Sequence, residues 1–190
     1  MKRDLFAVGL LLLSSCGMAV GRECKSVDFP DHLQVKGTEL ALNGLGIRKA
    51  TILKVSVYVA ALYVTTPAQD PKVLADPNTP AELILHFVRN VGVGDLRNAW
   101  SEGFEKAAKE QLPLLNARIA MLNSWMSDVK TGQRLTFIRI PGSGVQVVVN
   151  GVAKGTITGD DFSRALFSIW LGPEPPNADL KNGLLGGPCE

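Results

Sequence analysis

The sequence predicts an α+β fold in which helices pack on one face of an antiparallel β-sheet. Two observations predict this class. Strand-forming segments follow one another with short, turn-rich connections, which is typical of hairpins and not of parallel crossovers. Apolar residues at helical spacing are confined to three later segments. The chain therefore runs through strands, two helices, a meander of three strands and a last helix.

The first half of the domain is a series of strands. The expected strands cover residues 26–29, 32–35, 38–42, 50–64 and 82–89. Asn43-Gly44 is a tight-turn signal, and Gly44 with Gly46 is interpreted as the point where the backbone bends into the long strand 50–64. A loop over 67–80 is rich in Pro, Asp and Ala, with one helical turn at 72–75.

The second half alternates helices with a meander. The expected helices cover residues 95–108, 113–126 and 160–170, and the expected strands cover 134–139, 145–149 and 152–157. Asp95 is the predicted N-cap of the first helix, and Pro113 marks a break or a new first turn. Asn150-Gly151 is a hairpin signal, and Gly172 stops the last helix.

Length and composition fit one globular domain. The chain has 190 residues, of which 46% are hydrophobic, and a net charge of +2. We expect a single domain over residues 22–190, with a Gly/Pro-rich tail from about 173 that wraps the surface. The charges are mixed along the chain with no basic stripe, which argues against a nucleic-acid partner.

Residues 1–21 are predicted to be a signal peptide. A short basic segment precedes an apolar run from Leu5 to Leu13 that is too short to span a bilayer. Two cleavage sites remain open: small residues at 19–21 suit a general signal peptidase, whereas Leu13 to Cys16 resembles a lipobox in which Cys16 is lipidated. The domain is then periplasmic, and its one contact with the membrane is an N-terminal lipid anchor if Cys16 is modified.

Cys24 and Cys189 lie at the two ends of the exported chain. In an oxidising compartment such a pair is a candidate disulfide, provided that the chain ends meet. The alternative is two unpaired thiols on frayed ends. The chain has no Cys-x-x-Cys motif, so nothing indicates a thioredoxin-type redox role.

Arg48 and Tyr58 are the candidate ligand-binding residues. An arginine that enters an apolar strand needs an anionic partner, which is either a ligand carboxylate or a surface carboxylate of the protein. Tyr58 lies on a strand face of mixed polarity that suits a cleft above an apolar floor. His32 and His86 are far apart without a nearby acidic cluster, so we expect no metal and no cofactor.

Several segments together resemble a known family. Their order and spacing are similar to those of the secreted bacterial chalcone isomerase-like proteins, over about residues 26–172. They are Phe29-Pro30-Asp31, Asn43-Gly44-Leu45-Gly46-Ile47-Arg48, Val57 to Val64, Val149-Asn150-Gly151, Gly155, Gly159-Asp160-Asp161-Phe162, Ala165-Leu166 and Ile169-Trp170-Leu171-Gly172. The resemblance implies an antiparallel sheet with helices on one face, in agreement with the pattern above.

One branch of that family consists of enzymes. In chalcone isomerases an arginine stabilises the enolate oxygen during ring closure, and Arg48 matches it. Tyr58 falls about where the enzymes have a threonine that orders a catalytic water. The enzymes' other substrate-contacting side chains fall near Leu96, Gly103 and Ser168 or Ile169. Leu96 and Gly103 have no side-chain hydrogen-bond donor.

Another branch of the family binds fatty acids. There an arginine and a tyrosine hold the carboxylate, and the resemblance implies the same role for Arg48 and Tyr58. The leading hypothesis is therefore a non-catalytic periplasmic binder of a fatty acid or similar apolar carboxylate. The alternatives are an intramolecular lyase of chalcone isomerase type, with Arg48 catalytic, and an envelope lipoprotein with a vestigial pocket.

Overall fold

A seven-stranded antiparallel sheet organises the computed structural model, which describes residues 21–51 and 53–190. Its strands follow one another in chain order, so each strand pairs with its neighbours in the sequence. They are β3 (His32–Val35), β4 (Thr38–Ala50), β5 (Val55–Val64), β6 (Ala81–Phe87), β7 (Arg134–Ile140), β8 (Gly144–Val149) and β9 (Val152–Ile157). A separate hairpin pairs β1 (Gly21–Cys24) with β2 (Val27–Pro30).

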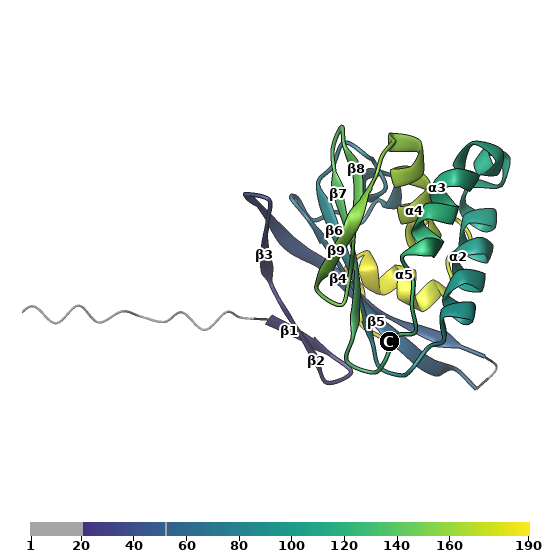
Figure 1. The fold of residues 1–190 in the computed structure, drawn as a ribbon. Coiled ribbons are helices and arrows are strands. Elements are labelled where there is room, and N and C mark those ends of the chain that lie inside the picture. The colour runs from purple at the N-terminus through teal and green to yellow at the C-terminus, as the bar shows by residue number, and fades with distance from the viewer. Residues whose placement is uncertain (1–20, 52) are drawn as a thin grey trace, which may run out of the picture.

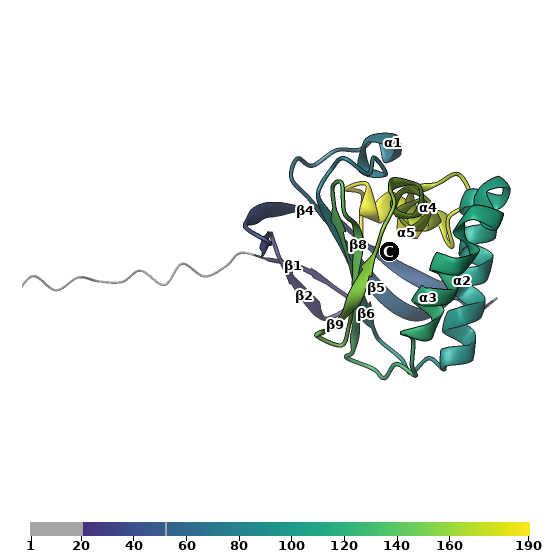
Figure 2. The same cartoon turned by 45° about the horizontal axis from the view of Figure 1, so that its top comes forward.

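The longer helices pack on one face of this sheet, which confirms the predicted class. Figures 1 and 2 show α2 to α5 on one side of the sheet and the β1–β2 hairpin on the other. The helices are α1 (Pro71–Leu74), α2 (Val93–Ala108), the 3-10 turn η1 (Lys109–Gln111), α3 (Leu112–Ser124), α4 (Asp160–Leu171) and α5 (Ala178–Leu184). The single helical turn expected at 72–75 corresponds to α1.

Both faces of β5 are buried, which explains its nearly uninterrupted apolar sequence. Tyr58, Ala60 and Leu62 point into the main core between the sheet and the helices. Val59 and Tyr63 alternate with them and point into a second cluster on the opposite face, where β1 and β2 contribute Cys24, Val27 and Phe29. The sheet therefore forms the central layer of the domain.

The turn between β4 and β5 lies after Ala50 and not at the predicted Asn43-Gly44. β4 continues through Asn43 with only a β-bulge between Leu42 and Gly44, and the chain turns between Ala50 and Val55. The turn signal at 43–44 is wrong because the Asn43 side chain serves a tertiary role. Its amide donates to Leu184 O at 2.7 Å and accepts from Ala68 N at 2.7 Å. This buried side chain ties β4 to two distant segments.

The C-terminal segment is not an irregular surface tail. Residues 178–184 form α5, which packs on β4 and buries Leu180 and Leu184. Gly44 and Gly46 make this contact possible, since they leave room for the backbone of α5. A Cβ atom at Gly46 would lie 2.4 Å from Leu180 O, and one at Gly44 would lie 2.1 Å from Gly183 O. The glycines of β4 are thus packing residues.

We expect Gly46→Ala to lower the free energy of unfolding by about 3 kcal/mol, because its Cβ collides with backbone that cannot rotate away. Gly94→Ala is the matched control, since nothing lies within 4 Å of a Cβ at that position in α2. Alanine is the better helix former, so Gly94→Ala should leave the protein as stable or slightly more stable. Urea unfolding of both variants measures the difference. Equal stability of the two would contradict the packing role of Gly46.

Helix boundaries differ slightly from the prediction at α2. The helix begins at Val93 with Gly92 at the N-cap, so Asp95 lies in the first turn and is not the cap. The Asp128 carboxylate accepts from Val93 N at 2.8 Å and satisfies one of the free N–H groups instead. Pro113 stands in the first turn of α3, after η1, as expected.

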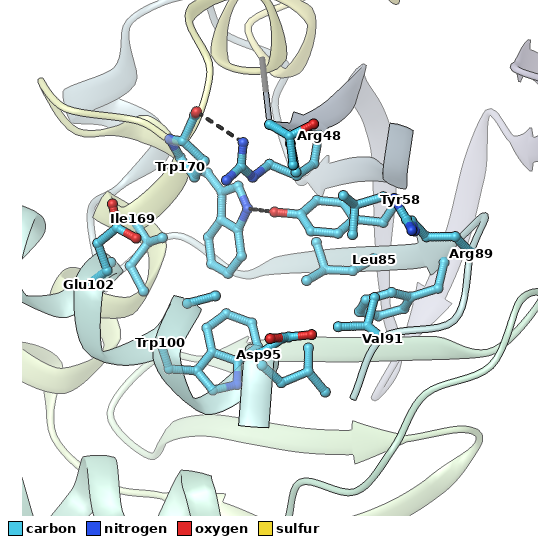
Figure 3. A pocket seen from close by; sticks show the side chains of 18 of the residues that line it. Arg48, Tyr58, Leu85, Arg89, Val91, Asp95, Trp100, Glu102, Ile169 and Trp170 are labelled. Atoms are coloured by element: carbon cyan, nitrogen blue, oxygen red, sulfur yellow. Dashed lines mark hydrogen bonds between the residues drawn. The ribbon is translucent and has the colours of Figure 1, made fainter. Parts of the chain in front are cut away.

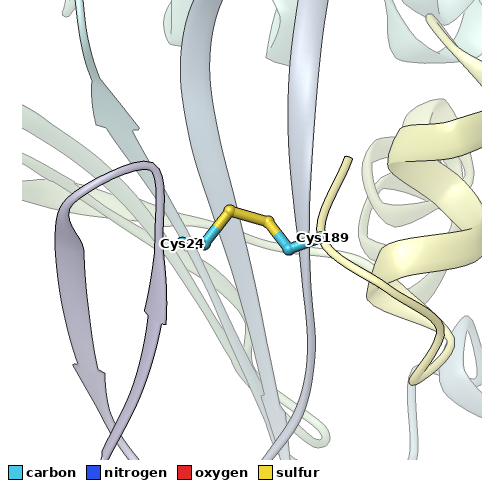
Figure 4. The surroundings of a disulfide bond; sticks show 2 residues. All are labelled: Cys24 and Cys189. Carbon is cyan, nitrogen blue, oxygen red and sulfur yellow. A yellow bond between two sulfur atoms is a disulfide. The ribbon is translucent and has the colours of Figure 1, made fainter.

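The two ends of the described domain lie close together, and Cys24 and Cys189 form a disulfide. Figure 4 shows the bond joining β1 to the segment that follows α5. The two Cα atoms are 6.1 Å apart although 165 positions separate the residues in sequence. The predicted disulfide is confirmed, and it closes nearly the whole domain into one covalent loop.

The predicted signal peptide, including Cys16, lies outside the described residues apart from its last position. Its cleavage and the lipidation of Cys16 remain predictions. Within residues 21–51 and 53–190, no helix is long and apolar enough to cross a membrane.

Candidate functional site

Arg48 and Tyr58 stand directly opposite each other on adjacent strands. The register of β4 and β5 pairs the two residues, and a second irregularity in β4 follows between Arg48 and Lys49. Cross-strand partners in such a pair have side chains close enough to act on one ligand. The structure therefore brings together the two residues that the sequence proposed as a pair.

Both side chains line a cavity of about 490 Å3 between the sheet and the helices. Figure 3 shows the phenol of Tyr58 and the guanidinium of Arg48 on one side of this space, with the indole of Trp100 across from them. The buried part of the wall is apolar and comes from β6, α2 and α4. It consists of Leu85, Phe87, Leu96, Trp100, Ile169 and Trp170.

Arg48 has no carboxylate partner among the residues that the structure describes. One guanidinium nitrogen, Nη1, donates to Lys49 O, to Pro176 O at 3.2 Å and to Asn177 Oδ1 at 3.0 Å. No hydrogen bond within the described chain uses its Nε or Nη2. The positive charge is therefore held by neutral oxygens on one side and keeps free donors for an anion.

Trp170 orients the phenol of Tyr58. The indole Nε1 donates to the Tyr58 hydroxyl at 2.9 Å, and both groups are buried. Tyr58 donates no hydrogen bond within residues 21–51 and 53–190, so its own proton is available to a ligand. Burial raises the pKa of Tyr58 to about 12, against smaller opposing effects of the Trp170 hydrogen bond and the Arg48 charge. Tyr58 is thus a neutral donor at physiological pH.

Charged residues mark where the cavity opens to solvent. Five lining residues are both charged and exposed, namely Arg89, Asp95, Glu102, Lys106 and Glu174. The Lys106 ammonium donates to Glu102, and this hydrogen bond is the main cause of the lowered pKa of Glu102; the charge of Arg48 contributes less. Glu102 is therefore already neutralised by Lys106, and it does not form a salt bridge with Arg48.

The histidines do not belong to this site. The His86 Nδ1 accepts from Arg134 Nε at 3.1 Å, and its ring packs edge-on against Phe29 on the opposite face of the sheet. His32 is exposed beside Glu39. No group of three or more His, Cys, Asp or Glu residues gathers as a metal site in the described part of the chain.

Two contributors to the site were missed in the sequence. Trp170 fits the apolar period of α4, so the sequence pattern indicates a core residue. No neighbouring residue in the sequence indicates that its N–H donates to Tyr58. Asn177 lies in a Pro-rich segment and accepts from both Arg48 Nη1 and Lys49 N. The pairing of an isolated Asn with a strand 128 positions away has no local sequence signal. Of the two other tryptophans, Trp100 lines the cavity and Trp125 does not.

Three of the positions matched to isomerase side chains face the same cavity but carry different chemistry. Leu96, Gly103 and Ile169 line it and have no side-chain hydrogen-bond donor, whereas Ser168, the alternative to Ile169, is not among the lining residues. α2 approaches α4 closely at Gly103, where an added Cβ would lie 2.9 Å from Ile169 Cγ2. A larger polar side chain at this position would require Ile169 to move. Arg48, which matches the arginine of the enzymes, lines the cavity, but Leu96 and Gly103 supply no side-chain donor beside it.

Known proteins share this architecture. Among 38 matching solved chains is the crystal structure of a fatty-acid binding protein from Arabidopsis thaliana, with a TM-score of 0.70 and 16% sequence identity. The match covers 88% of this chain and 96% of the Arabidopsis chain. No curated protein sequence matches this chain at a significant level. The model of the family described as chalcone isomerase-like matches residues 21–186. Because that match spans nearly the whole described domain and the fold agrees, this chain belongs to the chalcone isomerase-like family.

Proposed function

We propose that this protein binds a fatty acid or a similar apolar carboxylate in the cavity between sheet and helices, in the periplasm and without catalysing a reaction. One observation carries the proposal. The Arg48 guanidinium stands without a protein carboxylate, opposite the free phenol proton of Tyr58, beside a buried apolar wall. An amphipathic anion satisfies both parts of such a site.

The two parts of the ligand are bound by different forces. Charge-assisted hydrogen bonds from Arg48 and a neutral one from Tyr58 fix the carboxylate. Contact with the apolar wall contributes about 25 cal/mol for each Å2 of acyl chain removed from water. The cavity, at about 490 Å3, has the size of a small-molecule site.

The fatty-acid binding protein of Arabidopsis supports the ligand class, since it has the same fold. The predicted signal peptide and the disulfide support an oxidising compartment outside the cytoplasm. The alternative of a chalcone isomerase-type lyase is favoured by Arg48 alone. It is opposed by Leu96 and Gly103, which place no hydrogen-bond donor in the cavity where the enzymes have side-chain donors.

Native mass spectrometry of the exported protein, followed by extraction of any bound molecule, tests the proposal. We expect a co-purifying fatty acid. In a second step the emptied protein is titrated with a saturated fatty acid and with the primary alcohol of the same chain length. The acid should bind at least about 10-fold more tightly, because only the carboxylate forms charge-assisted bonds with Arg48.

Equal affinity for acid and alcohol would contradict the carboxylate site. If the protein binds neither the acid nor the alcohol but cyclises chalcone faster than the spontaneous reaction, the hypothesis of a chalcone isomerase-type lyase is favoured.

A further inference from the structure

The connection between β4 and β5 exposes apolar side chains that the fold does not use. Leu53 is 85% exposed, more than any other large apolar side chain in the described part of the protein. Val55, two positions later at the start of β5, is 37% exposed. Neither residue belongs to one of the two core clusters. A single exposed leucine is common on protein surfaces, whereas Leu53 is accompanied on the same connection by the exposed Val55 and by two lysines, a grouping that indicates a partner outside the chain.

The turn between β4 and β5 contains residues that are unfavourable in its backbone conformation. Thr51 and Lys54 adopt left-handed backbone angles, with φ of 63° and 49°, and Lys54 N donates to Thr51 O at 3.0 Å. Glycine or asparagine is the usual residue in this conformation, and a β-branched threonine is an outlier. The sequence of this turn is therefore not the one that would stabilise it best.

Basic side chains flank the exposed leucine. Lys49 precedes the turn on β4 and Lys54 is the last residue of the turn, and neither forms a salt bridge within residues 21–51 and 53–190. Lys49, Leu53, Lys54 and Val55 stand within seven positions of one another around this connection, and we term them the hairpin patch. An aliphatic side chain flanked by lysines suits an anionic lipid surface, where the chain enters the acyl region and the ammonium groups stay at the phosphates.

The hairpin patch adjoins the cavity. Ala50 and Thr51 line the cavity from the same connection, and Arg48 follows on β4. In Figure 1 the ends of β4 and β5 extend away from the body of the domain at the lower right. A surface on which this hairpin rested would lie next to the cavity opening, so an acyl chain could pass between the surface and the cavity with little exposure to water.

We propose that the hairpin patch docks the protein on a bilayer that contains anionic phospholipid, with Leu53 inserted into the lipid. Its purpose, the exchange of an acyl ligand with the membrane, rests on the proposed function. The docking is a separate property that requires no ligand and is measured without one.

Sedimentation with vesicles tests the docking. The exported domain is incubated with vesicles of phosphatidylethanolamine and phosphatidylglycerol in equal parts, and in parallel with vesicles of phosphatidylcholine. Leu53→Ser should lower partitioning to the anionic vesicles about 10-fold, because burial of one leucine is lost. Lys54→Gln should lower it about 5-fold, and neutral vesicles should bind wild type more weakly still.

Leu114→Ser is the matched control. Leu114 is also a highly exposed leucine, at 75%, but it lies on α3, which contributes no residue to the cavity lining. Its replacement should leave vesicle binding unchanged. Unchanged binding by Leu53→Ser, or an equal loss in Leu114→Ser, would overturn the proposal.

Fatty-acid binding in vesicle-free solution separates the two proposals. Leu53→Ser should bind fatty acid as wild type does, since Leu53 does not line the cavity. A protein that docks through Leu53 but takes no fatty acid supports the docking and contradicts the proposed function. A protein that takes fatty acid but ignores anionic vesicles contradicts the docking alone.

Discussion

Arg48→Ala is expected to weaken fatty-acid binding about 100-fold, while the fold remains intact. The carboxylate would lose its charge-assisted donors in a site largely removed from water, and the remaining Tyr58 phenol supplies one neutral hydrogen bond. Isothermal titration with a saturated fatty acid measures the loss, and far-ultraviolet circular dichroism with urea unfolding confirms the fold. Arg48→Lys should fall between wild type and alanine, because lysine keeps the charge but not the planar fork.

Asn177→Ala is the control that separates charge from packing. Arg48 also holds the 176–177 segment through Pro176 O and Asn177 Oδ1, so its removal loosens that segment as well. Asn177→Ala removes a main anchor of the segment but keeps the guanidinium. If Asn177→Ala lost as much affinity as Arg48→Ala, the position of the segment and not the cation would explain the effect, and the carboxylate role of Arg48 would be wrong.

Removal of the Cys24–Cys189 disulfide is expected to lower the free energy of unfolding by ~4–5 kcal/mol. The bond closes a loop of 165 positions, so the unfolded chain gains much conformational freedom when it is cut. The double variant Cys24→Ala, Cys189→Ala compared with wild type in urea measures this difference. Alanine is preferred to serine because Cys24 is only 4% exposed and a buried hydroxyl would add a cost of its own.

Chemical reduction provides an independent check on the same quantity. Wild type in excess dithiothreitol should unfold at the urea concentration of the double variant, since both lack the cross-link. A loss below about 1 kcal/mol in both experiments would show that the unfolded chain is already compact or that native strain offsets the entropy.

The layer architecture was predictable because its signals are local. The Asn150-Gly151 turn lies between β8 and β9 as expected, and Asn150 adopts the left-handed φ of 49° that such a turn requires. The apolar period of α2 likewise reflects a single buried face, whereas α4 is buried on most of its sides. Elements whose conformation is determined by residues within one short segment are therefore predictable from that segment.

The errors occurred where a distant partner decides the conformation. Asn43-Gly44 has the residues of a tight turn, yet α5 occupies the space beside it and uses the glycine for close approach. α5 itself is short, contains Gly183 and buries only Leu180, Gly183 and Leu184, so its seven residues carry little helical signal. The helix exists because β4 covers it.

The candidate site was predictable only for the residues that have a local sequence signal. An arginine and a tyrosine in an apolar context are visible in the sequence, and their direct pairing follows from the strand register. The chain turns between Ala50 and Val55 and not at the expected Asn43-Gly44, and the pair nevertheless meets across β4 and β5. Trp170 and Asn177, which hold Tyr58 and Arg48, reach them across more than one hundred positions and left no local trace.

The indole of Trp170 makes the cavity accessible to fluorescence measurement. The protein has three tryptophans, and two of them, Trp100 and Trp170, form part of the cavity wall with ring centroids 5.9 Å apart. The emission of an indole depends on the polarity around it and on the hydrogen bond made by its N–H. Replacement of water by an acyl chain would change both the surroundings of this pair and the phenol that Trp170 contacts. The domain therefore contains its own optical probe, with which the filling and emptying of the cavity can be followed in real time without a label.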